Sequence, residues 1–576
     1  MANYLSMYPI PPSEHLVENR VCRKCQVNFP ITDKDMEFYV KVSPVFDGKK
    51  YLIPPPTLCP DCRQQRRLSF RNERTLYKRK CDATGKEIVS IYSPDKPYKV
   101  YHQDYWWSDA WDPMSYGRAF DFTRSAMEQM GELMRMVPNQ SIGWVNNENS
   151  EYTNYLMNSI DCYMTVSGRN NEKCLYSRNI RESEIVIDSL QIIDCHNCYD
   201  IVASKSCYNV LHSFHIIECR DSINIRFCTW CEYCFGSIGL TNKKYYFFNI
   251  PFSKEEYEEN IKEFQSFTKN EQKRLLEEHF LKFPRRYLNE FENEKFYGID
   301  YTRNSKEIKQ SLFISECERL SFCFEQEKST DLYDCTMWWN NNSFCYEWLA
   351  IGSWLYNSHF FYYSIGVNDW FYFHSCFECS NIFLCAWLRN KSYCILNKQY
   401  TKEEYESLVP RIIEKMMADG EWWEFFPSTL SPFGYNETVA QEYSPLTKAE
   451  AISQEFNWSD YEAPFPKVEK IIPASRLPED ITEIPDDILN WAIECEISWK
   501  PFRIIKQELD FYRKHSLSIP KRHPDVRYMD RMTKRNPRKI FERKCDKCEK
   551  DMIMTYAPER REIVYCEECY MREIFK

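Results

Sequence analysis

The chain has 576 residues, a charged fraction of 28% and a formal net charge of −10. This length is too great for one compact core, so we expect several domains. The negative charge argues against a protein that coats nucleic acid over its whole surface. No run of about 18 apolar residues occurs, which predicts no membrane span. The first twenty residues lack a basic start followed by an apolar run, so we expect no secretory signal.

The cysteines indicate metal binding. There are 27 of them, several in Cys-x-x-Cys pairs. In a chain without a secretory signal, such pairs indicate reduced thiols and metal ligands, and hence a cytoplasmic protein.

Each end of the chain carries one intact four-cysteine set. The ligand candidates are Cys22, Cys25, Cys59 and Cys62 near the N-terminus, and Cys545, Cys548, Cys566 and Cys569 near the C-terminus. Two such knuckles give zinc a closed tetrahedral shell of four sulfurs. We therefore predict two Zn²⁺ per chain, and we expect the short segments around them to need the metal for folding.

The two cysteine sets do not occupy equivalent positions in the sequence repeat that the two ends share. Residues 59–105 align without a gap to 523–569 at a constant offset of 464, so each end is a tandem of two ribbon-like units. The second N-terminal unit has Cys81, Thr84, His102 and Tyr105 at its ligand positions, and the first C-terminal unit has Cys495, Ser498, His523 and Val526. Two remaining ligands hold structural zinc poorly, so we expect ribbon folds without metal there. The alternative is recruitment of a further ligand such as Asp104.

A row of basic residues recurs in both copies. We predict nucleic-acid contacts at Arg63, Arg66, Arg67, Arg71, Arg74, Arg79 and Lys80, and at Arg527, Arg531, Arg535, Arg538, Arg543 and Lys544. Arginine rows can bind phosphates as bidentate donors, and aromatic residues near the N-terminal row, such as Trp106 and Trp107, could stack on unpaired bases. A single run of basic residues is as typical of a solvated helix face as of a nucleic-acid contact, but the recurrence of the run in both copies favours nucleic-acid binding.

The middle of the chain repeats every 12 residues. Small or apolar residues recur in three rows: Ser183, Cys195, Cys207, Cys219 and Cys231; Cys198, Val210, Ser222 and Cys234; and Ser177, Ser189, Ile201, Ser213, Ile225 and Ser237. A fixed short period is typical of stacked coils that cannot bury a face alone. We predict a parallel β-helix, or β-solenoid, with about two 12-residue units per turn.

A longer repeat lies over this one. Residues 228–258 recur at 376–406, at an offset of 148. Ser253 and Thr401 precede Lys-Glu-Glu runs as helix N-caps, so each half is expected to end in a helix.

Two further functions remain possible for the repeat region in the middle of the chain. Cys228-x-x-Cys231-x-x-Cys234 could be an iron–sulfur motif, but the 12-residue phase already accounts for Cys231 and Cys234. The aromatic residues of the second half could line a groove for sugars or bases, although core packing is favoured; they are Trp338, Trp339, Trp348, Trp354 and Trp370 to Phe373.

No catalytic motif stands out. There is no Gly-rich phosphate loop, nucleophile elbow or His-Glu-x-x-His sequence. Asp188, Asp194 and Asp200 are spaced by six residues, which places them on different faces of the coil and not as an acid/base pair.

Both ends resemble a bacterial family. Phe29-Pro30-Ile31-Thr32 after the first Cys-x-x-Cys, and Pro60-Asp61-Cys62-Arg63 in the second, look like the zinc-ribbon modules of bacterial proteins. The strings Arg71-Asn72-Glu73-Arg74, Arg535-Asn536-Pro537-Arg538 and Thr555 to Arg560 are similar to those of large bacterial zinc-ribbon proteins with no assigned activity. The resemblance implies zinc binding and no particular reaction.

The predicted protein is mainly β, with duplicated tandem zinc-ribbon modules flanking a two-halved β-solenoid and with short α-helices. The predicted domains are 1–140, 141–282, 283–416, a Pro-rich acidic linker at 417–490, and 491–576. We expect a non-catalytic zinc-binding protein that binds nucleic acid, RNA before DNA. The alternatives are a structural or protein-interaction scaffold, with the arginine rows packed on acidic partners or on the solenoid itself, and a carbohydrate-active β-helix enzyme.

Overall fold

The computed structural model describes residues 8–46, 48–297, 300–336, 345–346, 356–362, 364, 368–465 and 467–574. Within these residues the protein is mainly β, with several parallel sheets and with helices α1 to α12. Trp338, Trp339, Trp348 and Trp354, considered above as groove residues, lie outside the described residues.

Residues 144–251 form a first pair of sheets, the first ladder. One sheet contains β9 (Trp144–Val145), β10 (Asn154–Met157), β11 (Val166–Arg169), β12 (Arg178–Arg181), β14 (Leu190–Ile193) and β16 (Val202–Lys205). The other contains β13 (Glu184–Ile187), β15 (His196–Tyr199), β17 (Tyr208–Leu211), β18 (Arg220–Ile223), β19 (Glu232–Phe235), β20 (Lys244–Phe247) and β21 (Ile250–Pro251). Apart from the β20–β21 hairpin, the neighbouring strands are parallel.

The register of this ladder is 12 residues. Arg178 pairs with Leu190, and Glu184 pairs with His196. Each 12-residue segment therefore adds one strand to each sheet, and the expectation of two such units per turn is wrong. One unit suffices because non-glycine residues with positive φ recur every three residues, as at Asp194, Asn197 and Asp200, and let the chain turn within 12 residues. Many of them are Asn or Asp, which tolerate this backbone region best.

The interior of the first ladder is filled by every third residue. From Ile180 to Ser237 these side chains are all buried, including Cys195, Cys207 and Cys219. The three rows seen in the sequence are interior rows, and Ile180, Ile192, Ser204, Ile216 and Cys228 form a fourth.

Residues 290–399 form the second ladder in the same way. One sheet contains β23 (Glu290–Phe291), β25 (Asp300–Arg303), β27 (Leu312–Ser315) and β29 (Phe324–Glu327). The other contains β24 (Glu294–Tyr297), β26 (Lys306–Lys309), β28 (Glu318–Ser321), β30 (Thr330–Tyr333), β31 (Cys345–Tyr346), β32 (Tyr356–Tyr362), β33 (Asn368–His374), β34 (Ser380–Ala386), β35 (Ser392–Ile395) and β36 (Lys398–Gln399). Phe371, Tyr372 and Phe373 are buried, as core packing predicts.

Two irregular steps interrupt the second ladder. Leu332 pairs with Cys345 and Tyr346 pairs with His359, each 13 residues apart. Equivalent positions of the two ladders therefore differ by 146 in residue number before these steps, as Asp188 and Asp334 do, and by 148 after them.

Helices follow each ladder, as predicted. The first is followed by α5 (Lys254–Ser266) and α6 (Lys269–Leu281), and the second by α7 (Lys402–Ala418). Ser253 and Thr401 both cap their helices in capping boxes, with Glu256 and Glu404 as the reciprocal partners.

The terminal modules are built from hairpins and short helices. The N-terminal module contains β1 (Leu16–Val21), β2 (Asn28–Thr32), α1 (Asp33–Val42), β3 (Val45–Phe46), β4 (Lys49–Lys50), α2 (Pro60–Leu68), β5 (Tyr77–Lys80), β6 (Glu87–Ser90), β7 (Val100–Tyr101), α3 (Gln103–Trp107), α4 (Ala126–Met136) and β8 (Asn139–Gln140). The C-terminal module contains β38 (Trp491–Glu494), β39 (Pro501–Phe502), α10 (Lys506–Lys514), α11 (Pro524–Lys534), β40 (Phe541–Lys544), β41 (Asp551–Met554), β42 (Val564–Tyr565) and α12 (Glu567–Ile574).

The segment 417–490 is more ordered than the extended linker that was expected. It contains α8 (Val439–Tyr443), α9 (Lys448–Ser453) and β37 (Lys470–Pro473). Trp422, Phe426 and Tyr435 are buried, and Phe426 belongs to the core shared with the N-terminal module and the second ladder. The aromatic residues hold this segment against the rest of the chain despite its prolines.

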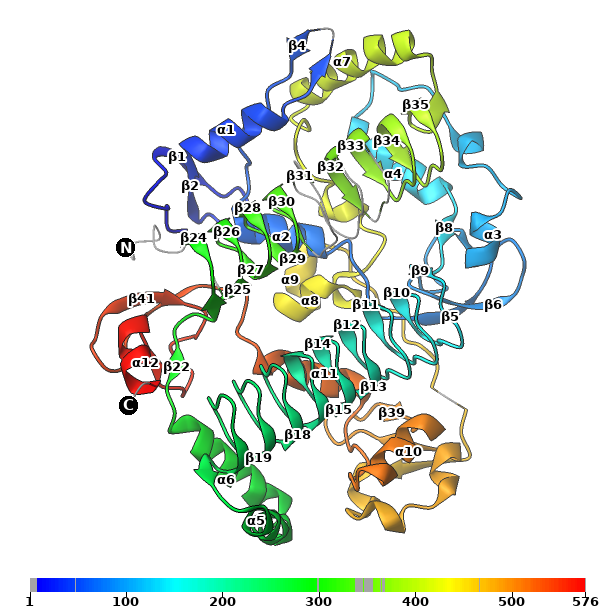
Figure 1. Cartoon of the computed structure of the whole chain (residues 1–576). Helices are drawn as coiled ribbons and strands as arrows, with labels where there is room; N and C mark the ends of the chain where they lie inside the picture. Colours follow the sequence, from blue (N-terminus) through cyan, green and yellow to red (C-terminus); the bar gives the residue numbers. More distant parts are fainter. Residues whose placement is uncertain are drawn as a thin grey trace.

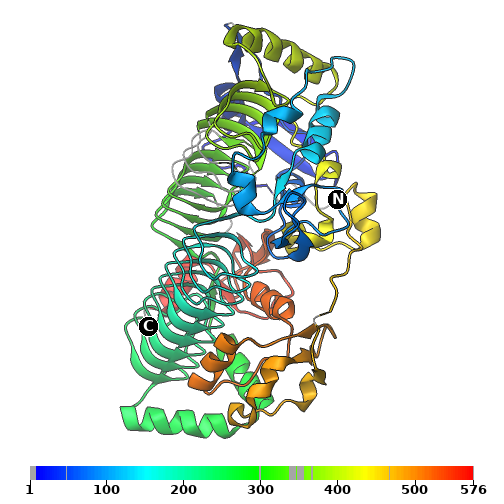
Figure 2. The same cartoon turned by 90° about the vertical axis from the view of Figure 1, so that its right-hand side faces the viewer.

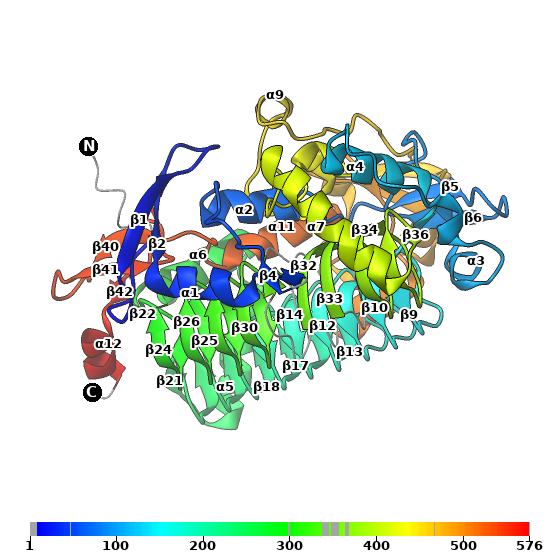
Figure 3. The ribbon, with the colours of Figure 1, turned by 90° about the horizontal axis from the view of Figure 1, so that it is seen from above.

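The two ladders run in opposite directions. The first runs from β9 to β19 and the second from β24 to β35, and α2 and α11 lie against them (Figure 1). The strands stack along one side of the molecule, with residues 420–490 and much of the two modules on the other, while the last part of the C-terminal module (red) lies behind the strands in this view (Figure 2). The view from above shows α2, α7 and α11 over the ladders (Figure 3).

Each module touches both ladders. Asn154 of the first ladder donates to the Asn72 and Glu73 carbonyls of the N-terminal module. Asp300, the equivalent residue of the second ladder, accepts from Asn536 and Thr555 of the C-terminal module, and β22 (Arg285–Arg286), just before that ladder, pairs with β42. Conversely, α1 of the N-terminal module packs on Phe322 and Tyr333 of the second ladder, and α10 of the C-terminal module packs on Tyr176 and Ile187 of the first. Each module therefore extends from one ladder to the other.

Candidate metal centres and the arginine rows

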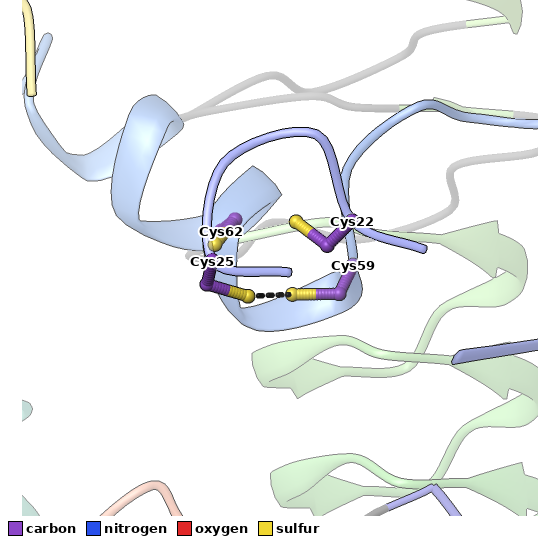
Figure 4. A group of neighbouring side chains, drawn as sticks. All are labelled: Cys22, Cys25, Cys59 and Cys62. Atoms are coloured by element: carbon purple, nitrogen blue, oxygen red, sulfur yellow. Dashed lines mark hydrogen bonds between the residues drawn. The ribbon is translucent and has the colours of Figure 1, made fainter. Parts of the chain in front are cut away.

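The N-terminal four-cysteine set is assembled from a knuckle and a helix start. Cys22 and Cys25 lie in the turn between β1 and β2, where Gln26 takes a positive φ of 62° and its N–H donates to the Cys22 carbonyl. Cys59 is the N-cap of α2, and Cys62 lies in its first turn. All four Sγ atoms lie within 4.8 Å of one another, with Cys25 and Cys59 3.6 Å apart (Figure 4).

The C-terminal set has the same construction. Cys545 and Cys548 lie in the turn between β40 and β41, and Cys566 and Cys569 lie at the start of α12. The Sγ atoms of Cys548 and Cys566 are 3.7 Å apart, and the Cys566 N–H donates to the Cys545 sulfur at 3.2 Å.

This geometry fits a metal ion held by four sulfurs. Zinc–sulfur bonds of about 2.3 Å in a tetrahedron place the sulfurs about 3.8 Å apart, close to both observed separations. In each set one cysteine is exposed and three are buried. Both groups could thus hold a metal ion, as the sequence predicted.

The two degenerate units do not form such groups. Among the described residues, clusters of metal-ligating side chains occur at the two four-cysteine sets alone. The Cys81 sulfur accepts the N–H of His102, as the Cys545 sulfur does from Cys566, and the His102 ring accepts the N–H of Asp104. Cys495 accepts the N–H groups of Ile497 and Ser498, and His523 caps α11.

The cysteines inside the ladders are packing residues. Cys228, Cys231 and Cys234 are fully buried, and the Sγ atom of each lies near backbone carbonyls of its own and the next turn. Their place in three of the four interior rows accounts for the Cys-x-x-Cys-x-x-Cys spacing without an iron–sulfur cluster.

The structure places most of the basic residues inside the molecule. Arg63, Arg67, Arg71, Arg527, Arg531 and Arg535 are buried; Arg66, Arg74, Arg79, Arg538 and Arg543 are half-buried; Lys80 and Lys544 are exposed. A buried guanidinium needs a counter-charge because desolvation is costly. The counter-charges belong to this chain.

Arg63 and Arg67 of α2 contact one aspartate of the second ladder. The Arg63 Nη2 atom lies 2.6 Å from Asp334 Oδ2, and Arg67 Nη2 lies 3.7 Å from Asp334 Oδ1. All three side chains are at most 1% exposed. The Arg63 guanidinium also donates to the Leu58 carbonyl and lies over the Phe322 ring.

Arg527 and Arg531 of α11 repeat this arrangement on the first ladder. Arg527 and Arg531 both pair with the buried Asp188, the latter at 2.9 Å. Arg527 lies over the Tyr176 ring, which occupies the position equivalent to Phe322. A group of two module arginines and one ladder aspartate, called a clamp below, therefore occurs on each ladder.

A further buried network lies between the clamps. Glu73 pairs with Arg71 and, at 2.5 Å, with Arg178 of the first ladder. Burial alone would raise the pKa of Glu73, but attraction to Arg178 and Arg71 outweighs it and lowers this pKa to about 2. Arg535 and Arg538 pair in the same region with Glu325 of the second ladder, at 3.7 and 3.0 Å.

The two modules also meet each other. Arg74 pairs with Asp525 at 3.0 Å, and its guanidinium lies 3.6 Å from the centre of the Tyr528 ring. The Tyr528 hydroxyl donates to Glu442 from the segment 417–490.

The acidic partners were not identified from the sequence. In the sequence Asp188 stands out only as one of three evenly spaced aspartates, and no motif marks Asp334, Glu325 or Glu73. Asp188 and Asp334 are equivalent at the offset of 146, and this signal could have found them. Asp200 is also paired, with Lys534 at 2.8 Å, and Asp194 lies beside His196.

No helix in the described residues combines the length and apolar character needed to cross a bilayer. No protein-family model and no curated protein matches the chain, so the resemblance to bacterial zinc-ribbon proteins has no support beyond the two cysteine groups. Among solved structures, a "putative acetyltransferase" from Desulfovibrio desulfuricans G20 matches at 8% identity over 48% of this chain and 81% of that chain, with a TM-score of 0.11. A score this low carries no argument about fold or function.

Proposed function

We propose that this protein is a non-catalytic scaffold, in which two terminal zinc-ribbon modules (1–140 and 491–576) fasten together the two halves of a β-solenoid (141–282 and 283–416). The observation that carries this proposal is the recurrence of a buried clamp, with Arg63 and Arg67 on Asp334 and Arg527 and Arg531 on Asp188.

Burial and pairing favour the scaffold over nucleic-acid binding by these arginines. A phosphate could reach Arg63 or Arg527 only by displacing a buried aspartate and opening the module–ladder interface. Breaking a buried ion pair by removing one partner costs about 3–5 kcal/mol. Phosphate binding at these positions would have to offset that cost.

Zinc is the metal proposed for both cysteine groups. Four thiolates suit zinc, and a shell closed by four protein ligands leaves no position for a substrate. The bound ion would supply a structural cross-link between a knuckle and a helix start. In the N-terminal module that helix is α2, which carries Arg63 and Arg67.

The experiment that tests the scaffold is hydrogen exchange of the full chain before and after metal removal with a strong chelator. We expect exchange to increase in α2 and also in the second-ladder strands that it clamps. Unchanged exchange in those strands, with the N-terminal module fully exchanging, would contradict the proposal.

RNA binding remains a second candidate, at different residues. Lys80 and Lys544 are exposed and occupy equivalent positions in the two modules. Such residues could contact a phosphate backbone, with a strong dependence on salt. A gel shift of bulk RNA at low salt that is lost in the Lys80→Glu, Lys544→Glu double variant would support this candidate, and no shift at low salt would reject it.

A further inference from the structure

A groove unrelated to the metal centres lies between the N-terminal module and the end of the second ladder. It has a volume of about 610 Å³, within the range of about 300–1,000 Å³ typical of ligand sites. One wall is the end of α3, with Trp107, and the loop after it, with Trp111 and two aspartates; the other is the ladder, with Phe377 and Glu378.

The aromatic wall is held in place before any ligand binds. Arg389 of the ladder donates to the carbonyls of Trp106, at 2.9 Å, and of Ser108 and Trp111, at 3.3 Å. The Trp111 indole N–H donates to the Trp106 carbonyl at 2.7 Å. One guanidinium thus fixes the end of α3, which carries Trp107, and the loop that carries Trp111, and this lowers the entropic cost of binding.

Trp107 presents an open ring to this groove. Its ring packs edge-on against Trp106 and Phe377, with centroids 4.9 and 5.0 Å away, yet the residue is 45% exposed. The part of this ring that solvent reaches lines the groove together with the carboxylates of Asp109, Asp112 and Glu378.

The charges of the groove select against ionic ligands. Asp109, Asp112 and Glu378 are exposed carboxylates that would repel a phosphate or a nucleotide. Arg389 and Lys391 would repel a cationic ligand. The Arg389 guanidinium already donates to backbone carbonyls, which leaves fewer of its N–H groups to bind an anion. A neutral molecule with an apolar ring face and many hydroxyl groups fits this lining, because the ring face can stack on an aromatic residue and the hydroxyls can donate to carboxylates.

We propose that this groove binds a neutral oligosaccharide. A sugar ring would stack its C–H face on Trp107, and its hydroxyls would donate to Asp109, Asp112 and Glu378. The proposal concerns binding alone and is independent of the scaffold role, because none of these residues belongs to the clamps.

The test is native affinity electrophoresis of the full chain in gels that contain dextran, laminarin or xylan. We expect at least one of the three to retard the protein, and Trp107→Ala to weaken that binding about tenfold or more, which corresponds to about 1.4 kcal/mol. The matched control is Trp499→Ala, since Trp499 is 71% exposed on the C-terminal module, far from the groove in sequence. This variant should be retarded as strongly as the wild type.

A second variant separates stacking from hydrogen bonding. Glu378→Gln keeps the size of an exposed side chain, so it should fold normally and weaken retardation less than Trp107→Ala does. Absence of retardation by all three polysaccharides would overturn the proposal, as would equal retardation of Trp107→Ala. Tighter binding of a nucleotide or a lysine peptide that depends on Trp107 would overturn it too, by assigning the groove to another ligand.

Discussion

The guanidinium of Arg63 lies 2.6 Å from the carboxylate of Asp334, and both side chains are shielded from solvent. The first residue belongs to the N-terminal module and the second to the second ladder, so their pairing ties together distant parts of the chain. The equivalent pair, Arg527 and Asp188, ties the C-terminal module to the first ladder.

Removal of either clamp aspartate should destabilise the protein. Asp188→Ala and Asp334→Ala each leave two buried guanidinium groups without their shared partner, so we expect each to lower the free energy of unfolding by about 3–5 kcal/mol. Urea unfolding followed by circular dichroism measures this loss. Asp194→Ala is the control on the same ladder, since Asp194 has the same positive φ as Asp188 but is half-exposed beside His196, and it should lower stability by no more than the backbone cost of about 1–2 kcal/mol. Equal effects of Asp188→Ala and Asp194→Ala would argue against the clamp.

The crossing of the modules predicts where each substitution acts. Asp334→Ala should raise hydrogen exchange in α2 and in β28 and β30, which neighbour Asp334, before it affects α11. Asp188→Ala should do the reverse. A uniform rise across both ladders in either variant would show instead that the chain opens as a single unit.

The Glu73 network predicts acid sensitivity. The pKa of Glu73 lies at about 2 in the folded chain, below its ordinary value of about 4.5. A depressed folded-state pKa stabilises the protein above the unfolded-state pKa, and this contribution is lost as the pH falls from about 4.5 towards 2.

Glu73→Gln should therefore reduce stability at pH 7 and flatten its fall below pH 4.5, since Gln does not titrate. Urea midpoints between pH 7 and pH 3 measure both effects. Glu87→Gln, at an exposed position of β6, is the control and should keep the wild-type slope. If Glu73→Gln retains that slope as well, the acid sensitivity has another source.

Metal analysis distinguishes the intact from the degenerate units. We expect two zinc ions per purified chain by mass spectrometry, and one after Cys25→Ser or Cys548→Ser. Cys81→Ser and Cys495→Ser should leave the count at two, because in the described residues neither sulfur belongs to a group of three or more metal-ligating side chains. Four ions in the wild type, or a loss with Cys81→Ser, would mean that the degenerate units bind metal.

The sequence predicts local features of this fold well. Cys-x-x-Cys spacing identifies both metal groups because each knuckle is complete within a few residues. The 12-residue period gives the strand register, since the same few positions face the interior in every turn. The 12-residue period alone does not give the size of a turn, which depends on the recurrence of interior positions every three residues.

Long-range relationships were harder to predict. The role of the arginine rows depends on which carboxylates they meet, and Asp188 and Asp334 acquire their partners only when the modules cross. The two 13-residue steps near β31 change the offset between ladders from 146 to 148, which hides the equivalence of these aspartates. In 417–490 the prolines suggested an extended chain, although Trp422 and Phe426 gave an aromatic signal for burial.

The most direct test of the account is a double-mutant cycle on Arg63 and Asp334. Unfolding free energies would be measured for the wild type, Arg63→Met, Asp334→Leu and the double variant. We predict a coupling energy of about 2 kcal/mol or more, in the range found for close, desolvated charge pairs. A coupling energy below about 0.5 kcal/mol, the level of independent sites, would contradict the claim that the arginine rows fasten the modules to the ladders.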